Sequence, residues 1–428
     1  NFVIPLYWGL GLALLLVKRT RFTLPLALGL ALFLGLSGAI MPCPKPEAPA
    51  IKTFPDMVFE YLDESVSSGD VKAAITLNNK NVRASNDDLQ ATYVFIIGES
   101  HSKRHSSLYG YGRETMPEMG KLKATGDLVL FTDVVSPNSF TCYVVPRLLS
   151  FASHESGMAS YDTQNIFDVM NVAGFKTFWF GNQSGYDSND PQCHGIASRA
   201  SVWKVSPNGG LPDSCLMPML DAALKDKAPR KFIVLHLWGS HFEYSRCYPP
   251  GFGNFKTDES SPLFNAEQNL HKAEINSYDN SVLFTDSILG TVVSKLKAAG
   301  GKSFMLYLSD HGENLYELKS VVTHMDFMPT RYSAEIPMLL WMSDKYKELS
   351  PKAKIDCIKK SSSNPYDSDD IINTVIDLSS IKTPRFDEEK SIVNQNFIPK
   401  RRIVSNDGLD YDSLLTVSRA AFLNQPGK

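Results

Sequence analysis

The sequence predicts an α/β protein in which a mostly parallel β-sheet lies between two layers of helices. From residue 92 onward, short apolar runs alternate with segments whose apolar residues recur at helical spacing. Strands buried on both faces of a parallel sheet have such continuous apolar runs. The expected strands are residues 93–97, 128–131, 175–180, 231–238, 304–308 and 336–341, and the expected helices include 159–173 and 277–297.

The first 41 residues are predicted to form two transmembrane helices that precede this fold. Residues 2–17 and 22–41 are nearly free of charged side chains, and the second stretch is about as long as a bilayer is thick. The basic loop at residues 18–21 is expected to stay in the cytoplasm, because cytoplasmic loops are rich in Lys and Arg. A helical hairpin buried in a soluble core is the alternative, but uncharged stretches of this length are rare in soluble domains.

The chain is therefore expected to have three parts: a transmembrane helical hairpin at 1–41, a connector along the membrane at 42–91, and a periplasmic domain at 92–428. Six cysteines suit an oxidising compartment, and Cys193 with Cys215 is the one disulfide that we expect. The net charge of −3 argues against a nucleic-acid partner, which needs a clustered basic surface.

A carboxylate and an imidazole stand side by side after the strand expected at 304–308. Asp310 and His311 follow this strand, and open α/β sheets bind ligands at the carboxyl ends of their strands. Both side chains can bind metal ions. Alone, the pair is more typical of a turn in which His311 is a cap and Asp310 accepts a backbone N–H. A metal site therefore requires partners from elsewhere in the chain.

Glu99 follows the first expected strand in the same way. Gly98 directly before it is expected to let the backbone turn, so that the carboxylate points into the crevice. The same residues also suit a helix N-terminus. His101 and His105 come next, and the lysine and arginine between them favour a solvated basic face over metal binding.

Thr141 lies where a polar loop runs into an apolar, helix-like segment. Backbone N–H groups and the helix dipole at such a place favour phosphate and a developing alkoxide, which a metal would stabilise further. The alternative is that Thr141 or Ser139 is simply the N-cap. His241, after the strand expected at 231–238, and His324, in a later loop, are each more often ordinary polar groups than ligands.

The joint pattern of these residues resembles the phosphoethanolamine transferases of Gram-negative envelopes, within the alkaline-phosphatase and sulfatase superfamily. The match runs from residue 92 to about residue 341 and includes the motifs at residues 108–117, 278–280 and 309–313. It also extends to the membrane segments. The residues that carry it, in chain order, are Glu99, Thr141, His241, Asp310, His311 and His324.

The resemblance implies an alkaline-phosphatase-like fold and a zinc site in the domain at 92–428. It implies that Thr141, and not Ser139, is the nucleophile, and that His241 and His324 bind the phosphate or a second metal. Either histidine would also protonate a leaving group. Asn182 is expected to contact the donor or the acceptor. The implied Zn²⁺ ligands are Glu99, Thr141, Asp310 and His311.

The resemblance also implies an activity, partners and a location. The protein would take phosphoethanolamine from phosphatidylethanolamine and transfer it through a phosphothreonine to lipopolysaccharide, at a core sugar or lipid A, or to another envelope glycan. It would be a multi-pass protein of the bacterial inner membrane, with its catalytic domain in the periplasm. Residues 237–241 and 329–331 are more similar to the members that modify the lipopolysaccharide core than to those that modify lipid A.

The sequence departs from the family at two places. Lipid A enzymes flank their nucleophile with a disulfide, whereas Pro137 and Arg147 stand at these positions and Cys142 directly follows Thr141. The family usually has five membrane helices, whereas only two are predicted here. We therefore expect further helices, and residues that bind the lipid donor, to be missing.

Three other functions remain open at this point. A lipid-dependent glycerol-phosphate transferase would share the fold and the membrane anchor. A phosphatase or sulfatase would share the metal chemistry, although the Cys/Ser-x-Pro-x-Arg motif of sulfatases is not found around Thr141. A membrane-tethered envelope scaffold would bind no metal.

Overall fold

The computed structural model describes residues 68–183, 191–206, 209–210, 212–318, 322–326 and 329–413. The chain separates into two units, Asn1–Ser65 and Val66–Lys428, and all of the described residues belong to the second. Both predicted membrane segments and most of the predicted connector lie outside the described residues. Within the described ranges, no helix is long and apolar enough to span a bilayer.

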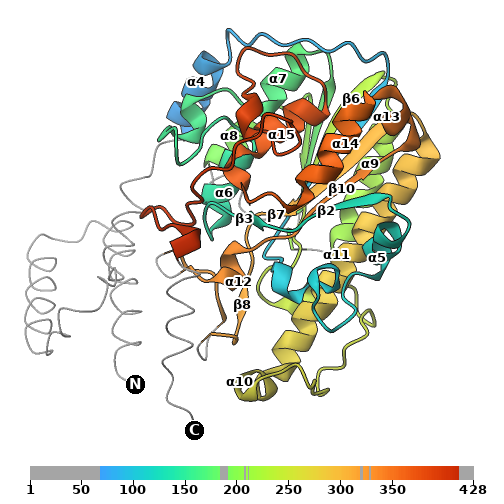
Figure 1. The fold of residues 1–428 in the computed structure, drawn as a ribbon, viewed down its shortest axis with the longest axis vertical. Coiled ribbons are helices and arrows are strands. Elements are labelled where there is room, and N and C mark those ends of the chain that lie inside the picture. The colour runs from blue at the N-terminus through green and yellow to red at the C-terminus, as the bar shows by residue number, and fades with distance from the viewer. Residues whose placement is uncertain are drawn as a thin grey trace, which may run out of the picture. The chain divides into compact units, whose positions relative to one another are not determined.

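A seven-stranded sheet forms the centre of the second unit (Figure 1). The strand order is β2-β10-β7-β1-β6-β4-β5, and all neighbours are parallel except that β10 runs antiparallel to β7 and β2. The mostly parallel sheet is confirmed, and all six predicted runs form strands in it. The strands are β1 (Ala91–Gly98), β2 (Leu128–Phe131), β4 (Lys176–Gly181), β5 (Val202–Val205), β6 (Arg230–His236), β7 (Lys302–Ser309) and β10 (Met338–Met342).

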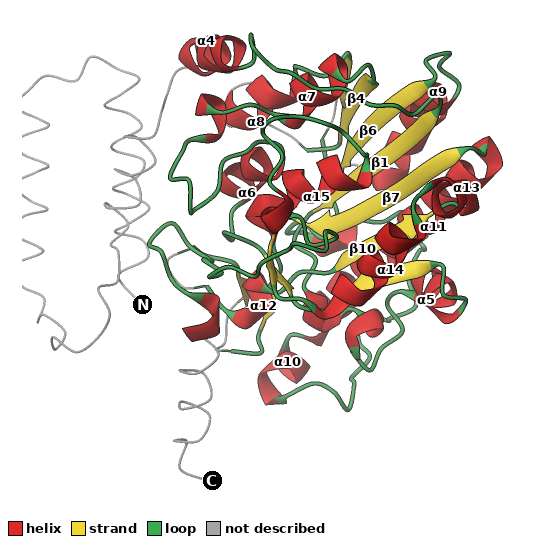
Figure 2. Ribbon diagram, turned by 45° about the horizontal axis from the view of Figure 1, so that its top comes forward, coloured by secondary structure: helices red, strands yellow, loops and turns green. Residues whose placement is uncertain are grey.

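Helices cover both faces of this sheet (Figure 2). The described helices are α4 (Ser68–Asn78), α5 (Pro117–Ala124), α6 (Thr141–Leu148), α7 (Ile166–Val172), α8 (Pro191–Ala197), α9 (Met217–Leu224), α10 (Ala266–Leu270), α11 (Lys272–Ala299), α12 (Arg331–Ala334), α13 (Asp344–Leu349), α14 (Lys352–Lys360) and α15 (Ile371–Leu378), of which α10 and α12 lie away from the faces of the sheet. The helix predicted at 277–297 is the centre of α11. The one predicted at 159–173 is shorter, because Asn165 accepts a hydrogen bond from the backbone of Asp168 and starts α7 there.

Two small sheets lie outside the central one. β3 (Val134–Val135) pairs in parallel with β11 (Tyr366–Asp367), and β8 (Asn314–Leu315) pairs antiparallel with β9 (Val322–Thr323). The first connects the segment before α6 to the C-terminal part of the chain. The second folds the loop that follows β7 back on itself.

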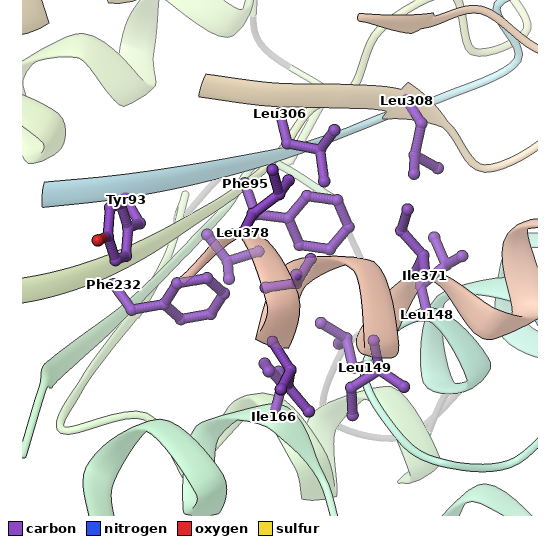
Figure 3. Packing of buried hydrophobic residues seen from close by; sticks show 14 of the residues in the cluster. Tyr93, Phe95, Leu148, Leu149, Ile166, Phe232, Leu306, Leu308, Ile371 and Leu378 are labelled. Atoms are coloured by element: carbon purple, nitrogen blue, oxygen red, sulfur yellow. The ribbon is translucent and has the colours of Figure 1, made fainter. Parts of the chain in front are cut away.

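The central strand β1 belongs to both hydrophobic cores. Tyr93, Phe95 and Ile97 pack on one face with residues of α6, α7 and α15 (Figure 3). Val94 and Ile96 pack on the other face with residues of α5, α9 and α11. Each large apolar side chain that is fully buried contributes roughly 1.5–3 kcal/mol. The two cores therefore hold β1 in register from both sides, which fixes the position of its C-terminal end.

The folded unit begins earlier than the boundary predicted at residue 92. Val71 and Ile75 of α4 are buried in the same core as α6 and α15. At the other end of the chain, Ile392 and Val393 are buried in that core too. Residues near both ends of the described chain therefore pack around the sheet.

The disulfide predicted between Cys193 and Cys215 is wrong. The five described cysteines do not pair with one another. Cys193 lies in the core on one face of the sheet, whereas Cys215 packs against the core on the other face. Two sulfur atoms separated by a sheet cannot approach to bonding distance. The remaining Cys43 lies outside the described residues.

The turn after β1 has a different cause from the one predicted. Gly98 does not have a positive φ, and it is needed because a Cβ there would lie 2.5 Å from the hydroxyl of Tyr307. Ser100 takes the left-handed conformation instead, with φ 55°. From the neighbouring loop, Gly239 (φ 56°) approaches so closely that a Cβ would lie 2.7 Å from the carbonyl oxygen of Glu99.

Gly239→Ala is expected to destabilise the domain more than Gly157→Ala. Both glycines are left-handed, with φ 56° and 60°, so each alanine costs roughly 1–2 kcal/mol in backbone strain. Gly157 has open space around it, whereas an alanine at position 239 also clashes with the backbone of Glu99. Urea unfolding of both variants measures the difference. Equal losses in the free energy of unfolding would show that the close approach of Gly239 to Glu99 does not affect stability.

Candidate metal centre

Strand pairing brings the first two candidate ligands together. β1 and β7 are parallel neighbours in which Gly98 pairs with Ser309, so Glu99 and Asp310 follow them at the same edge of the sheet. His311 comes next in the chain. Glu99, Asp310 and His311 each offer one ligand atom, these atoms lie within 4.8 Å of one another, and all three residues are buried. The predicted convergence of these residues is therefore present in the structure.

Thr141 completes the cluster. It is the first residue of α6, whose N-cap is Phe140 and has no side-chain capping bond, so the N-cap alternative is wrong. The Thr141 hydroxyl instead points at the ligand atoms. Its Oγ1 lies 2.8 Å from Asp310 Oδ2, 3.0 Å from Glu99 Oε2 and 3.5 Å from His311 Nε2.

A second set of hydrogen bonds aims each ligand at the centre. Asp310 Oδ1 accepts the backbone N–H groups of Ser100 (3.1 Å) and His311 (2.6 Å), which leaves Oδ2 for the site. Glu99 accepts hydrogen bonds from Ser100 Oγ (2.7 Å) and Gln183 Nε2 (3.2 Å). The Nδ1 atom of His311 lies 2.8 Å from the next carbonyl oxygen, so its Nε2 can face the centre as a ligand.

Burial and the charges within the cluster shift the pKa values of all three residues. Burial acts to raise the pKa of Glu99, but the hydrogen bond and charge of His311 outweigh it and hold this pKa well below its usual range. Burial and the charge of Glu99 raise the pKa of Asp310 to about 7. Burial lowers the pKa of His311, but both carboxylates more than offset this and raise it to about 10. Two carboxylates, one imidazole and one hydroxyl are a donor set that fits a divalent cation such as Zn²⁺.

The other two predicted histidines flank the cluster and are not buried in it. His324 Nδ1 lies 2.9 Å from Glu313 Oε2, and its ring centroid lies 4.5 Å from that of His311. His241 is partly exposed, and its charge helps to lower the pKa of Glu99. Both histidines are therefore partly open to solvent, unlike the three buried residues of the cluster.

Asn182 and its neighbour point to different partners. Asn182 is fully buried and donates to Asp213 (2.8 Å), which also accepts the backbone N–H of Gly239 (2.9 Å). Gln183 is the residue that reaches Glu99. Contact of Asn182 with a substrate stays a prediction, and its burial gives it no support. Alternation after β4 places Asn182 and Gln183 on opposite sides, but it does not tell which of the two reaches Glu99.

The solvated basic face predicted around His101 and His105 is wrong. His101 is buried with Nδ1 2.8 Å from the hydroxyl of Tyr307, and His105 is buried between Asp279 (2.7 Å) and Glu317 (2.8 Å). Burial lowers the pKa of His101 to about 3. Burial also acts to lower that of His105, but the two carboxylates raise it to about 9. Two short 3₁₀ turns fold this segment back against α11, which the neighbouring charges in the sequence did not reveal.

Sequence and structure comparisons agree with this geometry. The family model described as Sulfatase matches residues 91–381. Phosphoethanolamine transferase EptC of Escherichia coli is 31% identical over 339 residues, which are 76% of this chain and 57% of that protein. The Kdo(2)-lipid A phosphoethanolamine 7''-transferase of E. coli is 30% identical over 268 residues, 60% of this chain and 45% of that protein. The crystal structure of the periplasmic domain of E. coli EptC in complex with Zn is 30% identical, has a TM-score of 0.69, and aligns over 78% of this chain and 96% of that one.

This chain has a sulfatase-type α/β fold, with a mostly parallel sheet and a buried ligand cluster at the C-terminal ends of its strands. The chain belongs to the sulfatase family, in its branch of bacterial phosphoethanolamine transferases, as the sequence motifs predicted. It spans little more than half the length of the curated relatives it matches, 57% in the case of EptC.

Asp310→Asn is expected to lose most of the bound metal, while His241→Ala keeps it. The neutral amide is a far poorer ligand than the carboxylate, and the strand before residue 310 stays intact because the backbone is unchanged. His241 lies outside the cluster of converging ligand atoms. Elemental analysis of the purified, dialysed proteins measures metal per chain. Loss of metal in His241→Ala would show that this residue is a ligand.

Metal affinity is expected to rise between pH 6 and pH 8. In the metal-free protein the pKa of Asp310 is about 7 and that of His311 about 10, so both groups bind protons that a metal must displace. Raising the pH removes this competition and favours the metal. Zn²⁺ titrations with a competing chelator at several pH values measure the effect. An affinity that fell with rising pH would contradict these protonation states.

Proposed function

We propose that this protein transfers phosphoethanolamine from phosphatidylethanolamine to lipopolysaccharide or another envelope glycan, through a covalent phosphothreonine at Thr141. The observation that carries the proposal is the position of the Thr141 hydroxyl, within 3.5 Å of three ligand atoms. The names of the relatives support the transferred group, and the zinc complex of the E. coli domain supports the metal. The proposed Zn²⁺ ligands are Glu99, Thr141, Asp310 and His311.

Thr141 is the proposed nucleophile. A bound Zn²⁺ would lower the pKa of its hydroxyl and stabilise charge on the phosphoryl oxygens. The hydroxyl points toward carboxylate oxygens of Asp310 and Glu99, which can accept its proton. Oγ1 then attacks the phosphorus, the bond from phosphorus to the glycerol oxygen breaks, and diacylglycerol leaves. In the second step an acceptor hydroxyl attacks the phosphothreonine, and Thr141 regains its proton.

His324 or His241 protonates the glycerol oxygen as it leaves. Glu313, which is buried, holds Nδ1 of His324 at 2.9 Å, so Nε2 is the atom free to face the substrate. This pair has the geometry of an imidazole oriented by a carboxylate. Glu313 was part of a motif quoted from the sequence, yet only its contact with His324 indicates what it does.

The proposed donor also accounts for the predicted membrane segments. A phospholipid is met only at the bilayer surface, so an inner-membrane anchor at residues 1–41 would keep the domain near its donor. The E. coli structure is named as a periplasmic domain, which supports a periplasmic catalytic domain at 92–428. A relative named for Kdo(2)-lipid A supports an acceptor in lipopolysaccharide.

Thr141→Ala is expected to lower the rate of transfer by roughly a thousand-fold or more, while most of the metal stays bound. The variant lacks the nucleophilic oxygen but keeps Glu99, Asp310 and His311. Wild-type protein incubated with phosphatidylethanolamine and no acceptor should carry one phosphoethanolamine group on the peptide that contains Thr141. Mass spectrometry of the digested protein measures this adduct, and diacylglycerol release measures the first step.

Thr141→Ser is the matched control for this experiment. Serine keeps the hydroxyl and loses only the methyl group that restricts its rotamer, so partial activity is expected. Ser136 and Ser139 are nearby hydroxyls that are buried, and neither should be modified. An adduct on Ser139, or full transfer by Thr141→Ala, would contradict the assignment. Release of phosphoethanolamine to water alone would indicate a hydrolase.

A further inference from the structure

Three basic side chains surround one buried carboxylate, Glu335, and we call Lys103, Arg104 and Arg331 the basic patch. Arg104 binds both oxygens of Glu335, through Nε (2.6 Å) and a terminal amino group (2.8 Å). Lys103 Nζ lies 3.2 Å from the Glu335 carboxylate, and the Tyr411 hydroxyl donates a hydrogen bond to this carboxylate at 2.7 Å. Arg104 and Arg331 are each more than a third exposed, at 39% and 36% of the side chain.

Arg331 is left with little to bind inside the protein. Its Nε lies 3.4 Å from Glu335 Oε1, which already accepts hydrogen bonds from Arg104 and Tyr411. This Nε makes no hydrogen bond among the described residues, and no other carboxylate there lies within ion-pair distance of the guanidinium. A guanidinium has five N–H donors in a planar fork. Its terminal amino groups are therefore available to a ligand.

The neighbouring acidic groups already have basic partners of their own. Arg402, which stacks on Tyr411, binds both Asp133 and Asp412. On the other side, Glu317 binds His105, whose raised pKa keeps it charged. A single carboxylate, Glu335, thus faces the three cations of the basic patch. The basic patch therefore carries a net positive charge, although the net charge of the whole chain is −3.

The basic patch adjoins the metal centre. Arg331 begins α12, and the carbonyl of Ser333 in this helix accepts the N–H of Gly312 (2.7 Å), directly after the ligand His311. The carbonyl of Ala334 accepts the N–H of Ser136 (2.9 Å), in the loop that leads to Thr141. One helical turn is therefore bonded to both segments that carry the reacting groups.

We propose that the basic patch binds a phosphate group of the acceptor glycan, with Arg331 as the main contact. This inference rests on the proposed function. Phosphatidylethanolamine has one phosphate, which must lie at Thr141 to react, so it cannot also occupy Arg331. A phosphorylated acceptor has further phosphates at a distance from its reacting hydroxyl. The planar fork of arginine matches the geometry of phosphate oxygens, and Arg104 and Lys103 add charge beside it.

Arg331→Gln tests the proposal. The variant should form the Thr141 adduct and release diacylglycerol at the wild-type rate. Its KM for a phosphorylated lipopolysaccharide acceptor should rise roughly 10- to 100-fold, as expected when a hydrogen-bonded charge is lost, with kcat little changed. The phosphates that lie at a distance from the reacting hydroxyl are then removed from the same acceptor. For this dephosphorylated acceptor, wild type and variant should have equal KM values. Arg331→Lys should have an intermediate KM, since it keeps the charge and loses the fork.

Lys382→Gln is the matched control for charge removal. Lys382 is exposed (70%) and forms an ion pair with Asp87. Its backbone forms a β-bridge with Ser85, which comes before β1 and lies at the opposite end of the strands from the metal centre. Its KM should equal that of the wild type with every acceptor. A rise in KM for Lys382→Gln as large as that for Arg331→Gln would show a general charge effect and overturn the proposal.

Other outcomes separate this inference from the proposed function. If the wild type forms no Thr141 adduct, the proposed function fails. If the adduct forms normally but the KM of Arg331→Gln for the phosphorylated acceptor is unchanged, the inference alone fails. The donor step is also run in vesicles with and without phosphatidylglycerol. A loss of adduct formation by Arg331→Gln only in the anionic vesicles would assign the basic patch to membrane phosphate and overturn its assignment to the acceptor.

Discussion

The parallel pairing of β1 with β7 is the constraint on which the site depends. Because these strands run side by side in the same direction, the first residues after them, Glu99 and Asp310, lie together at one edge of the sheet. Neither residue would be near the other in a sheet of different order. Both hydrophobic cores hold β1 in place, so the energy of packing keeps two carboxylates at a distance that their repulsion opposes.

The loops around this edge supply what the strands cannot. Ser100 in its left-handed conformation directs one N–H to Asp310 and its hydroxyl to Glu99. The hydroxyl of Tyr278 in α11 donates to the Ser100 carbonyl (2.5 Å) and accepts the N–H of Ser102 (2.8 Å), so the long helix steadies this turn. These hydrogen bonds orient the side chains of the cluster, which would lower the cost of ordering them around a metal ion.

Burial distinguishes the two kinds of histidine around the site. His311 is buried between carboxylates and suits a metal, whereas His241 and His324 are partly exposed and suit proton transfer to a substrate that comes and goes. The carboxylates around the site are all buried and differ instead in the partners that they meet. Asp310 and Glu99 face the centre, while Glu313 and Glu335 orient or collect basic groups at its margin. Exposure to solvent therefore separates the histidines, whereas the partners of each side chain separate the carboxylates.

The sequence alone determined the mostly parallel sheet and six of its strands, because buried strands leave a local pattern. It determined the candidate ligands through their joint resemblance to a known family, since each residue taken alone also suited a turn or a cap. Only the tertiary structure decided which partners each side chain meets. Burial of His105 depends on α11, far away in the chain, and Cys193 and Cys215 are kept apart by a sheet that lies between them. Gln183, and not Asn182, reaches Glu99 because of the direction in which β4 ends. These contacts join residues distant in sequence, so no local pattern of composition or spacing encodes them.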